Sequence, residues 1–309
     1  MWRYLAQRSL RAAATVVGVV TLVFLLVRLV PGDPVDAILG DQASPEERAA
    51  LRQTLHLDAS LPVQYGHFVG DVLDGSLGHS FRSPARTVGS LIAEVLPATV
   101  ALSLAALALA FGIALPLGVL AAARRGTGVD ALASTVAVLG LAIPNIWLGP
   151  LLILAFAVEL RWLPLPGDDA SGVVGLLLPA VTLGTALAAI LTRQTRASML
   201  EVYDEQYVLA ARARGLSEPV VAIKHVLRNA LLPVLTIGAA QLGALLSGAV
   251  VTEKVFERAG LGQLFLDAFF ARDMPVVQGC VLVVAVTYVA LNIAVDLLYV
   301  VVDPRVRLA

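Results

Sequence analysis

The sequence predicts an all-α polytopic membrane protein with six transmembrane helices. Of its 309 residues, 58% are hydrophobic and 15% charged, and the mean hydropathy is +0.84. A soluble domain of ordinary composition has fewer apolar and more charged residues. Six apolar runs each have about the ~20 residues that a helix needs to cross ~30 Å of hydrocarbon. They cover approximately residues 12–30, 97–122, 132–158, 173–191, 231–251 and 276–302.

The first run follows Arg3, Arg8 and Arg11, a charge pattern that a secretory signal peptide also has. No small-residue cleavage site follows the run; a PGDP sequence at 31–34 and further spans do. We therefore expect residues 1–30 to form an uncleaved first transmembrane helix with its N-terminus in the cytoplasm. Cleavage as a signal peptide is the second alternative.

Residues 31–95 are polar and rich in acidic side chains, and we expect them to form an extracytoplasmic region. Ser44 and Glu47 have the spacing of a capping box that would open a short helix toward Leu55. The sequence GDVLDGSLGHS at 70–80 has the glycine and serine content of turns. The region either covers the pore as a solvated cap or contacts the substrate.

The remaining residues, 96–309, contain five predicted spans and one long charged segment at about 201–229. Tyr203, Tyr207 and Ala210 recur at helical spacing, Gly215 can end that helix in a left-handed conformation, and Ser217 can cap a second helix. The pattern predicts a helix, a sharp turn and a second helix. In the second helix, Val220, Ile223 and Leu227 fall on a face suited to membrane or a partner, opposite Lys224 and Arg228.

Several predicted spans contain Pro, Gly or polar residues, which membranes tolerate where neighbouring helices or a water-lined cavity satisfy the backbone. For most of the glycines we expect close helix packing. IPNIWLG at 143–149 differs, because a polar side chain lies beside a helix break near the centre of a span. The candidates for the translocation pathway or its gate are Pro144, Asn145 and Gln241. For Asp296 in the last span we expect a structural ion pair.

The charged segment carries a family resemblance. AARARGL at 210–216, followed by HVLRNALLPVLT, resembles the cytoplasmic coupling loop of ABC importer permeases, with the peptide/nickel branch most similar. The general loop has Glu-Ala-Ala, a glycine, and later Ile-x-Leu-Pro. This chain has Leu209 in place of the Glu, and only Leu227 matches the last motif, whereas LRN at 227–229 has the form of the peptide branch.

Two further stretches resemble the peptide-permease family: VTEKVFERAGLGQLFLDAFFARDMPVVQG at 251–279 and VDLLYVVVDPRVR near the end. In the first, we expect a turn at Gly260–Gly262 and an amphipathic stretch at 263–270 in an extracytoplasmic re-entrant or interfacial segment. The resemblance covers nearly the whole chain and implies a type I ABC importer permease fold. It also implies ATPase-coupling roles for Tyr207, Ala210, Ala211, Arg212, Arg214, Gly215, Leu216 and Ser217.

The resemblance implies one membrane-spanning permease subunit of an ATP-driven importer of di- or oligopeptides. Its partners would be a second homologous permease, two ABC ATPase subunits, an extracytoplasmic substrate-binding protein and the lipid bilayer. The sequence has no GxxxxGK[ST] phosphate loop, GxSxG elbow or HExxH zinc motif. We therefore expect no enzyme activity and no cofactor in this chain, with ATP and Mg bound by the partner ATPase subunits.

Scattered histidines and the single Cys280 predict no metal site, and a net charge of -1 argues against a nucleic-acid partner. Most Lys and Arg near span ends fall on one side, which the positive-inside rule makes cytoplasmic. We expect a multi-pass protein of the bacterial-type cytoplasmic membrane with both termini cytoplasmic. The basic residues on this side are Arg3, Arg8, Arg11, Arg124, Arg125, Arg193, Arg196, Arg212, Arg214, Lys224, Arg228, Arg305 and Arg307.

Three alternatives stay open. Within the same family, the substrate could instead be a nickel chelate or glutathione. A stand-alone secondary transporter would need coupling carboxylates at mid-membrane or an inverted repeat. A non-transporting membrane scaffold would leave the broken spans and the charged segment without a role.

Overall fold

The computed structural model describes residues 2–29, 35, 39, 43–54, 57–167 and 172–302. The described residues are helical apart from turns, loops and one antiparallel bridge between His79 and Thr87. The chain divides into two compact units. The first unit comprises Met1–Thr99 and Ala259–Ala290, and the second unit comprises Val100–Arg258 and Leu291–Ala309.

The predicted all-α membrane architecture is confirmed. Among the described residues, four helices are long and apolar enough to cross a membrane: Val88–Ala123, Val173–Tyr203, Glu218–Ser247 and Met274–Val295. A bent pair, Gly128–Ala142 with Asn145–Glu159, adds a fifth span if it is counted as one. The first predicted span lies in α1 (Trp2–Leu29), whose apolar part is Ala13–Leu25.

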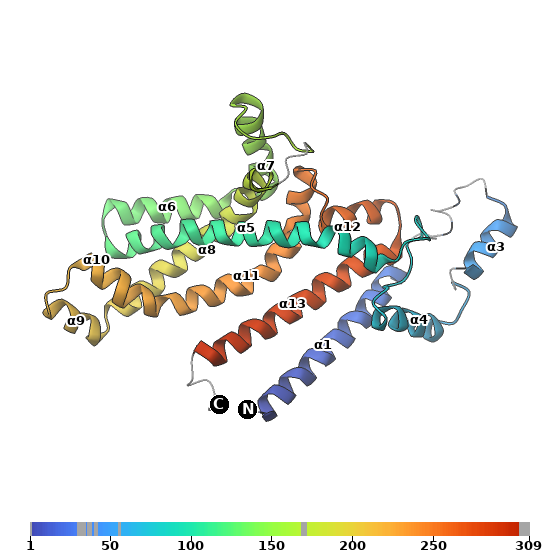
Figure 1. Ribbon diagram of the computed structural model, residues 1–309, viewed down its shortest axis with the longest axis horizontal. Coiled ribbons are helices and arrows are strands. Elements are labelled where there is room, and N and C mark those ends of the chain that lie inside the picture. Colours follow the sequence, from blue (N-terminus) through green and yellow to red (C-terminus); the bar gives the residue numbers. More distant parts are fainter. Residues whose placement is uncertain are drawn as a thin grey trace. The chain divides into compact units, whose positions relative to one another are not determined.

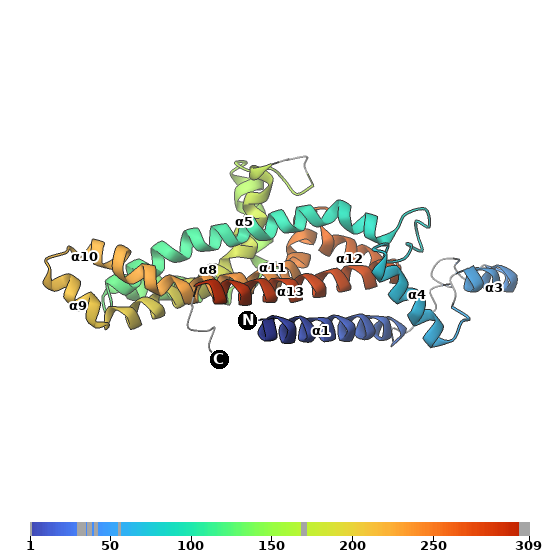
Figure 2. The same cartoon turned by 60° about the horizontal axis from the view of Figure 1, so that its bottom comes forward.

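The second unit is built from α6 (Gly128–Ala142), α8 (Val173–Tyr203), α11 (Arg228–Val255) and the part of α5 (Val88–Ala123) from Val100 onward. α8 packs against both α6 and α11. Figures 1 and 2 show these helices side by side, with α9 and α10 at one end of the bundle.

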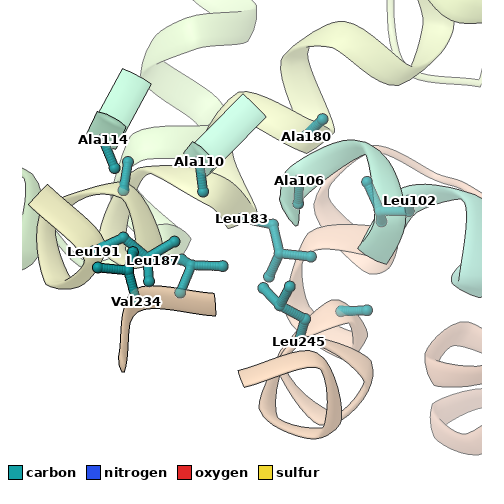
Figure 3. Packing of buried hydrophobic residues seen from close by; sticks show 12 residues of the cluster. Leu102, Ala106, Ala110, Ala114, Ala180, Leu183, Leu187, Leu191, Val234 and Leu245 are labelled. Atoms are coloured by element: carbon teal, nitrogen blue, oxygen red, sulfur yellow. The ribbon is translucent and has the colours of Figure 1, made fainter. Parts of the chain in front are cut away.

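Alanines and leucines make up nearly all of the core of the second unit (Figure 3). Because lipid tails are as apolar as leucine, helices associate in a membrane through close packing, which small residues permit. α5 presents a stripe at intervals of four residues to leucines of α8 and α11. The stripe is Leu102, Ala106, Ala110 and Ala114, and the facing residues include Leu183, Leu187, Leu191, Val234 and Leu245.

Hydroxyl groups inside α8 are satisfied within the helix itself. The side chains of Thr182, Thr192 and Thr195 are buried, and each donates a hydrogen bond of 2.7 to 2.9 Å to the carbonyl four residues earlier. Since hydrocarbon offers no hydrogen-bond partner, this local bond lets threonine occupy a spanning helix.

The third predicted span is broken at the Ile143–Pro144 step that the sequence indicated. α6 ends at Ala142, and α7 (Asn145–Leu152), continued by the π-helical segment η1 (Ile153–Glu159), leaves it at 99°. Pro144 causes the break because the residue before a proline is pushed out of the helical region, and Ile143 has φ -83° and ψ 117°. α7 stays in contact with α8 and α11, whereas η1 after it projects away from the bundle of the second unit (Figures 1 and 2).

In the first unit, α3 (Pro45–Thr54) begins with the predicted capping box. The Ser44 backbone N–H donates to Glu47 Oε2 at 2.8 Å, and the Glu47 N–H donates to Ser44 Oγ at 3.2 Å. The bonds from Ser44 lower the pKa of Glu47. The capping-box prediction is therefore confirmed.

α4 (Leu61–Leu73) packs on α1 through aromatic rings: the Phe24 ring lies 5.1 Å from that of Tyr65 and 5.8 Å from that of Phe68. The Tyr65 and Thr21 hydroxyls are 2.8 Å apart.

The turn predicted over 70–80 begins later than expected, because Gly70–Leu73 still belong to the helix. The turn itself is formed by Gly75, Leu77 and Gly78, which have positive φ.

α12 (Leu261–Phe270) and α13 (Met274–Val302) meet at a corner that holds a loop of the first unit. The Asp273 carboxylate, 4% exposed, accepts hydrogen bonds from the Ser80 hydroxyl and from the backbone N–H groups of Phe81 (3.1 Å) and Arg82 (3.4 Å).

The prediction of a turn at Gly260–Gly262 is wrong. Gly260 is the N-cap of α12 and Gly262 lies inside that helix, whereas the chain turns earlier, at Glu257, which has φ 49°.

Some predictions lie outside the described residues. These are the PGDP sequence at 31–34, the side chain of Asp296 and the end of VDLLYVVVDPRVR from residue 303.

Candidate functional site

The charged segment forms the predicted helix, turn and helix at one end of the second unit (Figure 1). α9 (Gln206–Ala213) is followed by α10 (Glu218–Val220), the π-helical segment η2 (Val221–Leu227) and then α11 without interruption. We call residues 201–229 the coupling segment. Its continuity with α8 and α11 means that any movement of the segment acts directly on two helices of the bundle core.

The turn between the two helices depends on Gly215. This residue has φ 78°, in the left-handed region that glycine adopts without steric cost, so the prediction of a glycine-ended helix is confirmed. A Cβ built at Gly215 meets no atom within 4 Å, so the glycine is needed for backbone conformation and not for space. Ser217 occupies the predicted N-cap position of α10, but its side chain makes no capping hydrogen bond.

A small apolar core fixes the coupling segment to the bundle. Met199 and Val208 are fully buried, Ala211 is 5% exposed, and they pack with Val221 and Val226. The resemblance implied ATPase-coupling roles for both Ala210 and Ala211. Ala210 is exposed, whereas Ala211 is covered by the segment's own core.

Arg212 joins the two helices of the coupling segment by a bidentate ion pair. Its Nε donates to Glu218 Oε1 at 2.8 Å and its Nη2 to Glu218 Oε2 at 3.1 Å, and its guanidinium lies 5.4 Å from the centre of the Tyr203 ring. The Glu218 carboxylate raises the pKa of Arg212. Parallel charge-assisted bonds define an orientation as well as an energy, so Arg212 braces the turn around Gly215.

A second polar contact ties α9 to the start of α11. Asn229 Nδ2 donates to the Tyr207 hydroxyl at 2.7 Å and to the His225 carbonyl at 3.1 Å. Tyr207 is thus a fixed part of the segment, although 41% of it is exposed. Arg214, Leu216 and Ser217 are exposed around the turn.

The outer surface of the coupling segment is apolar to an unusual degree for a charged stretch. Ile223 is 61% exposed and Leu209 56% exposed, and Tyr207, Leu216 and Val220 are exposed beside them in the sequence. Val220 and Ile223 are exposed, as expected for a face that meets membrane or a partner. Leu227, predicted on the same face, is instead partly buried, because it packs against the core that contains Val221, Ala222 and Val226. Several exposed apolar residues on one short segment are typical of an interaction surface.

The pathway candidates lie in two places. Pro144 and Asn145 are adjacent at the break between α6 and α7, with Asn145 half-buried. α7 packs against α11 at Gly149, where a Cβ would lie 3.0 Å from Val255. Gln241 is half-buried on α11, about 20 Å along that helix from Val255.

Three charged residues with specific partners were not found as site residues from the sequence. Asp130 and Arg196 form a bidentate ion pair in the second unit, and Asp273 holds the loop at 80–82 in the first. Arg196 entered the sequence analysis only as one of the basic residues that indicate orientation. A signal was available in principle, since a charged residue in or beside an apolar run usually has a partner.

Comparisons with known proteins agree with this architecture. Residues 114–308 match the family described as binding-protein-dependent transport system inner membrane component, and residues 1–103 match its N-terminal family. The chain is 40% identical over 307 residues to a glutathione transport system permease protein, GsiC, of Pectobacterium atrosepticum, covering 99% of both chains. It is also 40% identical over 334 residues to a di/tripeptide transport system permease protein, DppB, of Pseudomonas aeruginosa, again covering 99% of both.

Among solved structures, a chain of the MetNI methionine ABC transporter in inward-facing conformations matches with a TM-score of 0.59 and 20% identity, over 69% of this chain and 96% of that one. This likeness supports the fold. With the family match and the two full-length relatives, it confirms the resemblance drawn from the coupling segment. The chain belongs to the binding-protein-dependent transport system inner membrane component family, as a multi-pass ABC importer permease subunit of the peptide and nickel branch.

Proposed function

We propose that this permease subunit carries short peptides across the bacterial inner membrane into the cytoplasm. This proposal rests on the 40% identity, over 99% of the chain, to both a glutathione permease and a di/tripeptide permease. Glutathione and di- or tripeptides share one chemistry, a short backbone with free amino and carboxylate groups. Short peptides are therefore the substrate class, and nickel chelates have no comparable support.

The working assembly contains a second homologous permease, two cytoplasmic ATPase subunits that bind ATP and Mg, and an extracytoplasmic binding protein that delivers the peptide. In this assembly the permease performs no chemistry of its own. Both termini and the coupling segment face the cytoplasm, as the distribution of Lys and Arg predicts.

The coupling segment docks in a groove of one ATPase subunit. The exposed apolar residues, including Leu209 and Ile223, supply the contact, and Arg214 and Lys224 lie among them as polar contacts. The buried core around Val208 and the Arg212–Glu218 ion pair keep the segment rigid, so ATP-driven closure of the ATPase pair moves α8 and α11. That movement alternates access to the pathway between the two faces of the membrane.

The test is ATP hydrolysis and peptide uptake in proteoliposomes containing this chain, the second permease, the ATPases and the binding protein. We expect peptide-loaded binding protein to stimulate ATP hydrolysis and uptake together. Ile223→Asp places a charge in the docking surface and should weaken co-purification of the ATPase at least about fivefold. Leu73→Asp, an equally severe change at an 82% exposed leucine on α4, is the matched control and should retain the ATPase.

ATP-independent peptide flux by this chain alone would overturn the proposal and favour a secondary transporter. Normal ATPase recovery with Ile223→Asp would refute the docking surface and leave the substrate class standing.

A further inference from the structure

An ion pair within the second unit joins α6 to α8. Arg196 Nε donates to Asp130 Oδ1 at 2.6 Å, and Arg196 Nη2 donates to Asp130 Oδ2 at 2.9 Å. The Asp130 side chain is 8% exposed and the Arg196 side chain 32% exposed. Two parallel charge-assisted bonds to a nearly buried carboxylate fix both the distance between the helices and their rotation about their axes.

The same carboxylate is held from the turn that precedes α6. The Gly126 backbone N–H donates to Asp130 Oδ2 at 3.0 Å, and Ser134, one turn further along α6, adds a side-chain hydrogen bond. Gly126 has φ 74°, which lets the chain reverse between α5 and α6 with its N–H directed at Asp130. Asp130 therefore ties together three parts of the second unit: the turn after α5, the start of α6 and the C-terminal third of α8.

The other end of α6 is also in close contact with α8. A Cβ at Gly140 would lie 3.3 Å from Thr185 Cγ2 and 3.7 Å from the Ala189 Cβ. An ion pair at one end and a glycine contact at the other make α6 and α8 a single rigid pair. Each helix leads to one part of the candidate site: α8 ends at Tyr203, within the coupling segment, and α6 ends at Ala142, next to the break at Pro144.

Packing alone would hold these helices together, and replacing a buried ion pair with apolar residues often leaves stability unchanged. The bidentate guanidinium–carboxylate contact adds a geometric constraint, because it forms at only one register and one rotation of α6 relative to α8. The charged side chains nearest in sequence, Arg124, Arg125 and Arg193, are exposed.

We propose that Asp130 and Arg196 are positioning residues that transmit movement of the coupling segment through α8 to α6 and the broken span. The inference rests on the proposed function and assigns this step to two residues outside the coupling segment. Without the pair, α6 and α8 stay packed but can change register and rotation relative to each other, so α8 moves without imposing the same movement on α6. ATP hydrolysis then continues while transport fails to follow.

The test uses the complete reconstituted importer and measures peptide transported per ATP hydrolysed. We expect Asp130→Asn and Arg196→Gln to lower this ratio at least about fivefold, the usual lower range of coupling between sites. Arg196→Lys keeps the charge but loses the fork, so it should give an intermediate ratio. The exchange Asp130→Arg with Arg196→Asp should recover part of the ratio lost in either single charge reversal. Arg193→Gln, at an exposed arginine one turn earlier on α8, is the control and should leave the ratio unchanged.

A merely structural ion pair gives a different result: lower yield and a lower unfolding temperature of the complex, with the ratio unchanged in the complex that assembles. That outcome overturns the positioning role, and so does a double exchange that recovers nothing. If Asp130→Asn fails to assemble, the peptide transported per ATP hydrolysed by the Arg196→Lys importer tests the positioning role instead. Loss of binding-protein-stimulated transport in the unaltered importer would instead refute the proposed function.

Discussion

Gly184 on α8 and Gly112 on α5 show how the space around a residue decides what a substitution does. A Cβ at Gly184 would lie 2.8 Å from the Ala106 carbonyl oxygen, a backbone atom that cannot move without shifting α5. A Cβ at Gly112 meets nothing within 4 Å. The expectation that the glycines in the spans serve close packing is confirmed at Gly140, Gly149, Gly184 and Gly238, where a Cβ would lie within 3.3 Å of a neighbouring atom.

Gly184→Ala is expected to destabilise the protein by about 1–3 kcal/mol, because overpacking forces the α5 and α8 backbones apart. Gly112→Ala, the matched control, is expected to be neutral or to stabilise by up to about 1 kcal/mol, since alanine is the better helix former and the site is open. Thermal unfolding of the purified protein in detergent measures both. Equal unfolding temperatures for the two variants would contradict the packing argument.

At the scale of elements, the loop after His79 is held by a charged side chain that lies far away in the sequence, Asp273. The loop after His79 has little secondary structure of its own, and the Asp273 carboxylate between α12 and α13 supplies the acceptors for its Ser80 hydroxyl and two backbone N–H groups. The Ser80 hydroxyl in turn accepts from the Arg82 and Ser83 backbones at 3.2 and 2.9 Å. The loop is thus ordered by α12 and α13, and its conformation depends on one carboxylate.

Asp273→Ala should release this loop, because each buried donor left without an acceptor costs about 1–3 kcal/mol. The loop contains the bonds Arg82–Ser83 and Arg86–Thr87, so limited digestion with trypsin reports its opening. We expect faster cleavage at these bonds than in the unaltered protein. Asp58→Ala, at an exposed aspartate of the same unit, is the control; if it accelerates cleavage as much, the carboxylate does not order the loop.

For the whole molecule, the proposed orientation makes opposite predictions for two exposed loops. Ser83 follows α4 and precedes α5, whereas Arg125 lies between α5 and α6, so one span separates them. With the basic loops inside, Ser83 is extracytoplasmic and Arg125 cytoplasmic. On this proposed orientation, the coupling segment also faces the compartment that contains ATP.

Cysteine labelling in spheroplasts checks this orientation. In a Cys280→Ala background, Ser83→Cys should react with a membrane-impermeant maleimide in intact spheroplasts, and Arg125→Cys only after the membrane is permeabilised. The cysteine-free chain is the control for background labelling. The reverse pattern would place the coupling segment outside the cell and remove the basis for docking to an ATPase.

The sequence by itself determined those features that depend on composition and local order. Apolar runs of membrane length predicted the helical spans, Pro144 predicted the break, and Gly215 predicted the left-handed end of α9, because each rests on a residue's own conformational or solvation preference. The motif around residues 210–229 was sufficient to predict the family that the comparisons confirm.

Only the tertiary structure decided which side chains meet. Ala211 lies in the core of the coupling segment, Arg196 pairs with Asp130 across 66 residues, and Ser80 bonds to Asp273 across 193. Helical periodicity predicts which face of its own helix a residue lies on. It does not predict which neighbouring helix that face packs against. Such pairings depend on the rotation and register of packed helices, which many contacts set together, and for that reason these partners are decided only in three dimensions.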